Sequence, residues 1–375
     1  MTQNHIRVWR GDYYDGYLWY PADEDGLLLK INVETGQVDY ALTMLMPEKG
    51  LKHAYHQIVA TGDGILWTIP GWGSRILRID LRSGEQELID FPDSDRRVNF
   101  FSKFTGCIKY QDKIFCFPGN MNYILEINTA TKELCCHKNI IEDSDKRQGK
   151  SMQNYFSWGT FKVGNMVYAI GLFCNYFLEM NLEKMEYQLT ELRNEAGVCG
   201  FEGIAIHKNK LYAANKKGHV RVYDLESKAF LKQLDTEEKY RMLCGCEEGI
   251  LLVPNGVGNY AFYHAGTGEI KEKVYPETHK FVNAPENGVL VRDVIECDSN
   301  YYITCQYSNM TVVVNKESGE ISFIPLYLKS GVELTKYLLE QNGAVVRENV
   351  QLFCTNCTNL KSFICSVTEN GTTEG

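Results

Sequence analysis

The stretch from Gly64 to Gly84 decides the fold class of this 375-residue chain. It reads GILWTIPGWGSRILRIDLRSG: one apolar run at 65–70 ends in proline, a second at 75–80 ends in aspartate, and a Ser-Gly pair follows. Short apolar runs bounded by turn residues and rich in branched and aromatic side chains are typical of strands. The final glycine supplies the positive φ that a tight hairpin needs, and the aspartate can bond the turn backbone. The stretch therefore predicts consecutive antiparallel strands.

This phrase recurs along the chain. Its first apolar run is centred near residues 19, 67, 115, 168, 212, 251, 302 and 353, at intervals of 39 to 53 residues that average about 48. Another short strand precedes this run, so the run is the second strand of each four-stranded unit. A period of 40 to 50 residues made only of short strands is typical of propeller blades. Each unit buries its faces against its neighbours, so residues 1–375 are predicted to form a single β-propeller domain.

The unit count favours about eight four-stranded blades, with seven as the alternative. In the eighth unit the chain ends soon after its Asn-Gly turn at 370–371, so the run His5–Trp9 could supply the missing outer strand. Unit one would then keep only a short inner strand around Asp12–Tyr14; alternatively, His5–Trp9 is itself that inner strand. The segment 332–341 is predicted to be a short helical insertion between units seven and eight.

Composition limits the possible partners. Formal net charge is −9, which argues against nucleic-acid binding, and no run of 18 apolar residues predicts a membrane span. Thirteen cysteines, an odd number, without a recognisable secretion signal favour a reducing cytoplasm. We expect no cofactor, because no phosphate-binding or dinucleotide motif is complete. We also expect no metal site, because the C-x-x-C at 354–357 lacks a matching second pair.

The repeat at 64–84 resembles those of streptogramin-lyase-like β-propellers, and kelch-type repeats are more distantly similar. The resemblance is strong in units one to three and implies architecture alone. The metal-binding acidic and histidine residues of that lyase family cannot be placed on particular positions of this chain, so the family's activity is not carried over.

A binding site is expected where the inner strands begin, at the mouth of the central channel, because loops on a rigid scaffold carry function. Aligning units two to seven gives one equivalent position in each: His56, Thr105, Trp158, Glu202, Arg241 and Arg292. The two arginines could hold a carboxylate or phosphate, and Trp158 could stack on a planar ring. Glu202 and His56 could act as acid and base. A polar channel mouth with a structural Arg–Glu pair is the alternative interpretation.

The loops between the second and third strands share this face and supply a second set of candidates. These are Trp72, Arg75, Asn122 and Asn175, although Asn and Gly in such loops most often only form turns.

Three functions are compatible with this pattern. The first is a non-enzymatic propeller that recognises a small anionic or sugar-like ligand, or a protein segment, on the loop face. The second is a lyase or hydrolase that acts on a small or carbohydrate-like substrate at the channel mouth. The third is a protein-binding scaffold with an inert channel. The fold alone cannot choose among them.

Overall fold

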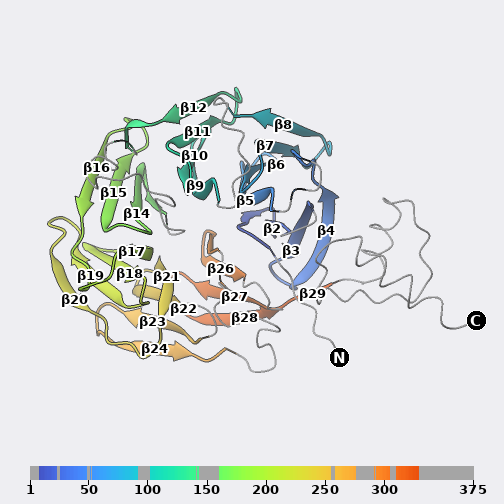
Figure 1. The fold of residues 1–375 in the computed structure, drawn as a ribbon. Coiled ribbons are helices and arrows are strands. Elements are labelled where there is room, and N and C mark those ends of the chain that lie inside the picture. Colours follow the sequence, from blue (N-terminus) through green and yellow to red (C-terminus); the bar gives the residue numbers. More distant parts are fainter. Residues whose placement is uncertain are drawn as a thin grey trace, which may run out of the picture.

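The computed structural model describes residues 8–22, 26–48, 51, 53–91, 102–140, 142, 160–254, 258–275, 291, 293–304 and 310–328. These residues form seven antiparallel four-stranded blades arranged in a ring, and a fifth strand extends the sheet of one blade (Figure 1). The chain is thus an all-β propeller, as the repeat predicts. The described residues form seven blades, which is the alternative blade count, and not the eight that the sequence analysis preferred.

Each blade runs from the channel outward in chain order, so its first strand lines the channel. Blades one to three are β1 (Asp12–Tyr14), β2 (Tyr17–Pro21), β3 (Leu27–Asn32), β4 (Gln37–Thr43); β5 (Tyr55–Ala60), β6 (Ile65–Pro70), β7 (Arg75–Asp80), β8 (Gln86–Asp90); and β9 (Phe104–Tyr110), β10 (Lys113–Pro118), β11 (Ile124–Asn128), β12 (Leu134–His137). Blades four and five are β13 (Phe161–Val163), β14 (Met166–Ile170), β15 (Tyr176–Asn181), β16 (Tyr187–Glu191); and β17 (Phe201–His207), β18 (Lys210–Asn215), β19 (Val220–Asp224), β20 (Phe230–Gln233). Blades six and seven are β21 (Tyr240–Gly245), β22 (Gly249–Pro254), β23 (Tyr260–His264), β24 (Ile270–Lys273); and β25 (Ile295–Glu296), β26 (Asn300–Thr304), β27 (Met310–Asn315), β28 (Ile321–Pro325).

The ring closes through blade one. Its inner strand is the short β1, and after blade seven the chain adds β29 (Tyr327–Leu328) in parallel to the outer edge of β4 (Figure 1). Val8 bridges Ala22 within blade one, and Arg10 bridges Gln57 of blade two. The eighth unit and the helix expected at 332–341 lie outside the described residues, as does most of the N-terminal run His5–Trp9.

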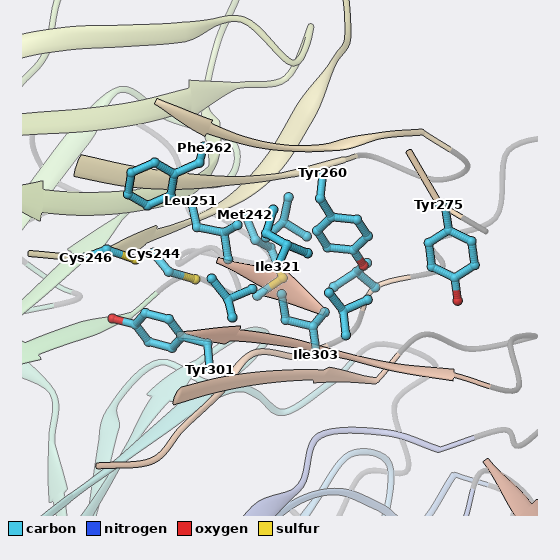
Figure 2. Packing of buried hydrophobic residues seen from close by; sticks show 14 of the residues in the cluster. Met242, Cys244, Cys246, Leu251, Tyr260, Phe262, Tyr275, Tyr301, Ile303 and Ile321 are labelled. Atoms are coloured by element: carbon cyan, nitrogen blue, oxygen red, sulfur yellow. The ribbon is translucent and has the colours of Figure 1, made fainter. Parts of the chain in front are cut away.

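The hydrophobic core lies in the layers between neighbouring blades. Figure 2 shows one such layer, in which Met242 and Leu251 of blade six face Ile303 and Ile321 of blade seven. The second strands are the most completely buried; Trp67 of β6, for example, has no exposed surface. Blades therefore stabilise one another by apolar burial on both faces. Among the described residues, no helix is long and apolar enough to cross a membrane.

Candidate functional site

The inner strands of four blades share one irregularity. In each, an aromatic residue pairs with the last residue of the next strand, and the residue after it has no partner across the ladder. The aromatic pairs are Tyr55–Pro70, Phe104–Pro118, Phe201–Asn215 and Tyr240–Pro254. The extra residues are His56, Thr105, Glu202 and Arg241. A β-bulge redirects the side chain of its extra residue, so one structural device presents these four at equivalent places in the ring.

The sequence alignment therefore selected structurally equivalent positions in blades two, three, five and six. Trp158 and Arg292, the positions expected for blades four and seven, lie outside the described residues. Whether the set binds a ligand remains a prediction.

Arg10 is the equivalent residue of blade one, and the sequence analysis missed it. Trp9 donates its backbone N–H to Pro21 O, while Val8 pairs with Ala22 and Asp12 with Trp19, so one residue is extra in this segment. The signal was present, because an aromatic residue, a charged residue and glycine at 9–11 repeat the order found at 201–203. The alignment began at unit two and so passed over it.

Arg10 is used to hold blades together. Its Nε donates to Asp293 Oδ1 of blade seven at 3.1 Å, and a terminal nitrogen donates to the carbonyl of Thr105 in blade three. The backbone N–H of Gly11 donates a second hydrogen bond to the same carboxylate, to Asp293 Oδ2 at 3.0 Å. Both charged side chains are buried, so this ion pair, which the sequence analysis did not predict, joins blades one and seven.

His56 is also held by its neighbours. Its ring stacks on Trp9 with centroids 3.8 Å apart, and its Nδ1 lies 2.7 Å from Ser102 Oγ. Gly71 packs against the imidazole so closely that a Cβ there would overlap the ring. His53 and Trp72 extend this aromatic group, with centroids 4.5 Å apart. His56 thus lies in a packed cluster between blades one and two.

Arg241 and Glu202 are different, because each has a buried side-chain atom without a hydrogen-bond partner in the described part of the chain. Arg241 is 7% exposed, and neither its buried Nε nor the buried Oε2 of Glu202 has a hydrogen-bond partner among the described residues. Burial lowers the pKa of Arg241, and the charge of Glu202 acts against that shift. Burial likewise raises the pKa of the Glu202 carboxyl, against the influence of Arg241 and Lys216. The charges of the two groups therefore stabilise each other, while one buried polar atom of each has no partner among the described residues.

Glycine makes this approach of blades five and six possible. Gly203 follows Glu202, and a Cβ at this position would overlap the backbone carbonyl of Arg241. A glycine is therefore required where β17 passes β21.

A second cation and an exposed ring flank the pair. Lys216, in the loop after β18, places Nζ 3.4 Å from the ring centroid of Phe173, which is 42% exposed. Burial lowers the pKa of Lys216, and the negative charge of Glu202 opposes this shift without cancelling it. Cys199 Sγ donates to Phe173 O at 3.1 Å and ties the loop before β17 to this ring. Arg241, Glu202, Lys216 and Phe173 are called the blade-five cluster below.

A polar network fixes the loops around the cluster. Glu195 binds Lys217 Nζ at 2.6 Å and His219 Nδ1 at 2.9 Å, and Asn215 Nδ2 donates to the same carboxylate at 3.3 Å. The bonds from Lys217 and then His219 hold the pKa of Glu195 down at about 2. Asn175 accepts from Gly200 N at 3.0 Å and anchors the other end of the loop. The loop that carries Cys199 is thus preorganised.

The other loop-face candidates, and Thr105 of the channel-mouth set, lie in different surroundings. Arg75 pairs with Asp90 at 2.8 Å on the outer strands of blade two. Trp72 packs on His53, Thr105 is buried, and Asn122 is exposed. Within the described ranges, no three His, Cys, Asp or Glu side chains are grouped so as to hold a metal ion.

No protein-family model matches the chain, and no curated protein matches it in sequence. Solved structures do resemble it. A streptogramin B lyase superposes with a TM-score of 0.57 at 10% identity, over 82% of this chain and 93% of that one. An inactive virginiamycin B lyase from Staphylococcus aureus, solved with quinupristin, gives 0.59 at 14%, over 87% and 97%. A chain of the Mitotic Checkpoint Complex gives 0.55 at 9%, over 87% and 92%.

At these identities the likeness establishes the fold alone. The architectural resemblance inferred from the repeats is confirmed. The neighbours include a lyase and a component of a protein assembly, and a propeller serves in general as a scaffold for binding or interaction.

Proposed function

We propose that the protein is a binding propeller whose blade-five cluster recognises a small anionic ligand on the loop face. The observation that carries the proposal is the Nε of Arg241, which is buried and has no hydrogen-bond partner among the described residues. A buried polar group without a partner costs free energy, and a charged one costs more. Such an arrangement is typical of sites whose missing partner is a ligand.

The chemistry of the cluster suggests which anion. A carboxylate or phosphate would satisfy Arg241 in bidentate fashion and gain the charge of Lys216. Glu202 needs a donor, which a hydroxyl or amine beside the anionic group would supply. Phe173 offers an apolar face at the rim. A sugar acid or another hydroxycarboxylate combines these features.

The contrast with Arg10 supports this assignment. Both arginines occupy the bulge position of their blades and both are 7% exposed. Arg10 donates from Nε to Asp293 and from a terminal nitrogen to Thr105, whereas the buried Nε of Arg241 has no partner among the described residues. The bulge position by itself therefore does not leave an arginine unpaired.

The lyase or hydrolase alternative stays a prediction. Its acid and base, Glu202 and His56, come from blades five and two, and His56 is engaged by Trp9 and Ser102. A protein segment on the loop face likewise stays a prediction.

A thermal-shift screen tests the proposal. The chain is heated with gluconate, glucuronate, malate and glucose, each at 10 mM. Ligands that bind only the folded state raise the melting temperature, so a hydroxycarboxylate should raise it and glucose should not. The Arg241→Met/Glu202→Gln variant should lose the response. Arg82→Met, which makes the same arginine substitution in an exposed turn, should keep it. A response that survives the double substitution would refute the site.

A further inference from the structure

Two cysteines face each other across the first two strands of blade three, β9 and β10 (Figure 1). Cys107 of β9 is paired in register with Cys116 of β10, and both are free thiols in the structure. Residues directly opposite in an antiparallel ladder project from the same face of the sheet. Both side chains accordingly pack into the apolar layer between blades two and three.

The position of this pair in the ladder brings the two side chains close together. Tyr110 and Lys113 flank the two-residue turn that joins the strands, so they form a hydrogen-bonded pair. The two kinds of pair alternate, and Cys107–Cys116 is the third pair beyond this one, so it is non-hydrogen-bonded. Opposed Cα atoms in such a pair are about 4.5 Å apart, which is within the range of roughly 4.4–6.8 Å that a disulfide spans. The backbone therefore already has the spacing of a disulfide.

The two thiols are in contact but differ in their exposure. They lie within hydrogen-bonding distance of each other, and burial, followed by this bond, raises the pKa of the Cys116 thiol. Cys116 has no exposed surface, whereas Cys107 is partly exposed on the strand that lines the channel. A small oxidant therefore meets Cys107 first, with Cys116 beside it.

Two other pairs of cysteines in the described structure do not have this geometry. Cys244 and Cys246 are both buried in the layer between blades six and seven (Figure 2). They are two positions apart on one strand segment, where Cα atoms are about 6.6 Å apart and the Cβ atoms point the same way. Cys136 is in the same row as Cys116, but Leu125 of β11 lies between them, so their strands are roughly 10 Å apart. Neither spacing brings two Cβ atoms to the roughly 4 Å of a disulfide.

We propose that Cys107 and Cys116 form a reversible disulfide when the chain meets hydrogen peroxide. The Cys107 thiolate attacks one peroxide oxygen, the O–O bond breaks, and the leaving hydroxide takes up the proton that Cys107 released; Cys107 becomes a sulfenic acid. The Cys116 sulfur then attacks the Cys107 sulfur, the S–O bond breaks, and the hydroxyl leaves as water with the proton of Cys116. Two thiols are oxidised, and one peroxide is reduced to two water molecules. A dithiol reductant reverses the step by thiol–disulfide exchange.

The bridge would join β9, which presents Thr105 at its bulge, to β10. It is separate from the blade-five cluster, so it stands whether or not an anion binds there.

Peptide mapping of the oxidised full chain tests the proposal. The reduced chain is treated with an equimolar amount of hydrogen peroxide at pH 7.5, free thiols are blocked with iodoacetamide, and the chain is digested with trypsin. Cleavage after Lys109 and Lys113 leaves the two cysteines on separate peptides, 104–109 and 114–132. A disulfide between these two peptides is expected, and dithiothreitol added to the folded chain before blocking should abolish it.

A sulfenic-acid trap, dimedone, separates the two steps. Cys116→Ala removes the thiol that consumes the sulfenic acid, so Cys107 should be labelled roughly fivefold or more above wild type. Cys107→Ser changes a partly exposed position, so it keeps the test available if Cys116→Ala does not fold. In this variant Cys116 should stay reduced under the same peroxide, because it has no exposed surface.

The other cysteine pairs supply the control. Cys244 and Cys246 lie on one tryptic peptide and should both be recovered with blocked thiols. The proposal would be overturned by dimedone labelling of wild-type Cys107 without a linked peptide, by a Cys107 that stays reduced, or by a link from Cys107 to Cys136. Equal oxidation of Cys244 and Cys246 would also overturn it, since it would indicate general oxidation of the chain. A bond present before peroxide is added, which dithiothreitol cannot reduce in the folded chain, would contradict reversibility.

Discussion

Replacing the Arg241 and Glu202 charges together should stabilise the fold while it abolishes ligand binding. Arg241 is buried and Glu202 partly buried at the start of their inner strands, and Arg241 Nε and Glu202 Oε2 have no hydrogen-bond partner among the described residues. Met fills the volume of the arginine stem, and Gln keeps the shape of Glu202 without its charge. The double substitution Arg241→Met/Glu202→Gln therefore removes two desolvated charges without leaving either one alone.

The size of the effect follows from general values. Replacing a buried charge pair by neutral side chains of similar volume is neutral or stabilises by about 1–4 kcal/mol. Glu202 is only partly buried, which places the expectation near the lower end, at about 1–2 kcal/mol. The unfolding entropy of about 2 cal/mol/K per residue makes this roughly 1–3 °C in melting temperature for a chain of this length.

Scanning calorimetry of wild type, both single variants and the double variant measures this. Glu202→Gln alone should destabilise relative to the double variant, because it leaves the guanidinium of Arg241 without its counter-charge. A fall of more than 2 °C in the double variant would refute the reasoning. That result would mean that the pair supports the fold as Arg10 and Asp293 do.

Two further predictions concern the inner strands. Burial, followed by the nearby charge of Asp293, raises the pKa of Asp12 from 3.8 to about 6, so the folded state binds this proton more tightly than the unfolded one. The contribution of Asp12 to the free energy of unfolding is complete below pH 4 and declines by up to about 3 kcal/mol as pH rises through 6. Urea unfolding at a series of pH values should show this decline, and Asp12→Asn should reduce it. Gly203→Ala should lower the free energy of unfolding by about 1–3 kcal/mol and weaken anion binding, because the added Cβ would displace β21. Gly266→Ala is the control, since a Cβ there meets no atom within 4 Å, and it should change neither quantity. Equal losses of stability in both glycine variants would contradict the argument from close approach.

Much of the fold followed from the sequence because its signals are local. Strand, turn and period are set within about 50 residues, and the strand pair at 65–70 and 75–80 is present as β6 and β7. The number of blades was not local. It depends on which strands close the ring. β29 joins the outer edge of β4 through only two residue pairs, and a strand this short has no recognisable sequence pattern.

The candidate site was predicted in part for the same reason. Equivalent positions in repeats could be aligned, which located Glu202 and Arg241. Their different surroundings could not be predicted, because partners such as Asp293 for Arg10 are 283 residues away. Lys216 and Phe173 come from different blades, so only the structure shows the cation over the ring.

The most direct test of the central claim locates an anion without knowing the ligand. Crystals of the wild-type chain and of Arg241→Met/Glu202→Gln are soaked in sodium bromide, and anomalous differences are measured. The blade-five cluster should hold a bromide between Arg241 and Lys216 in the wild type and none in the variant. Bromide at other surface positions of the wild type, with none at Arg241, would contradict the account.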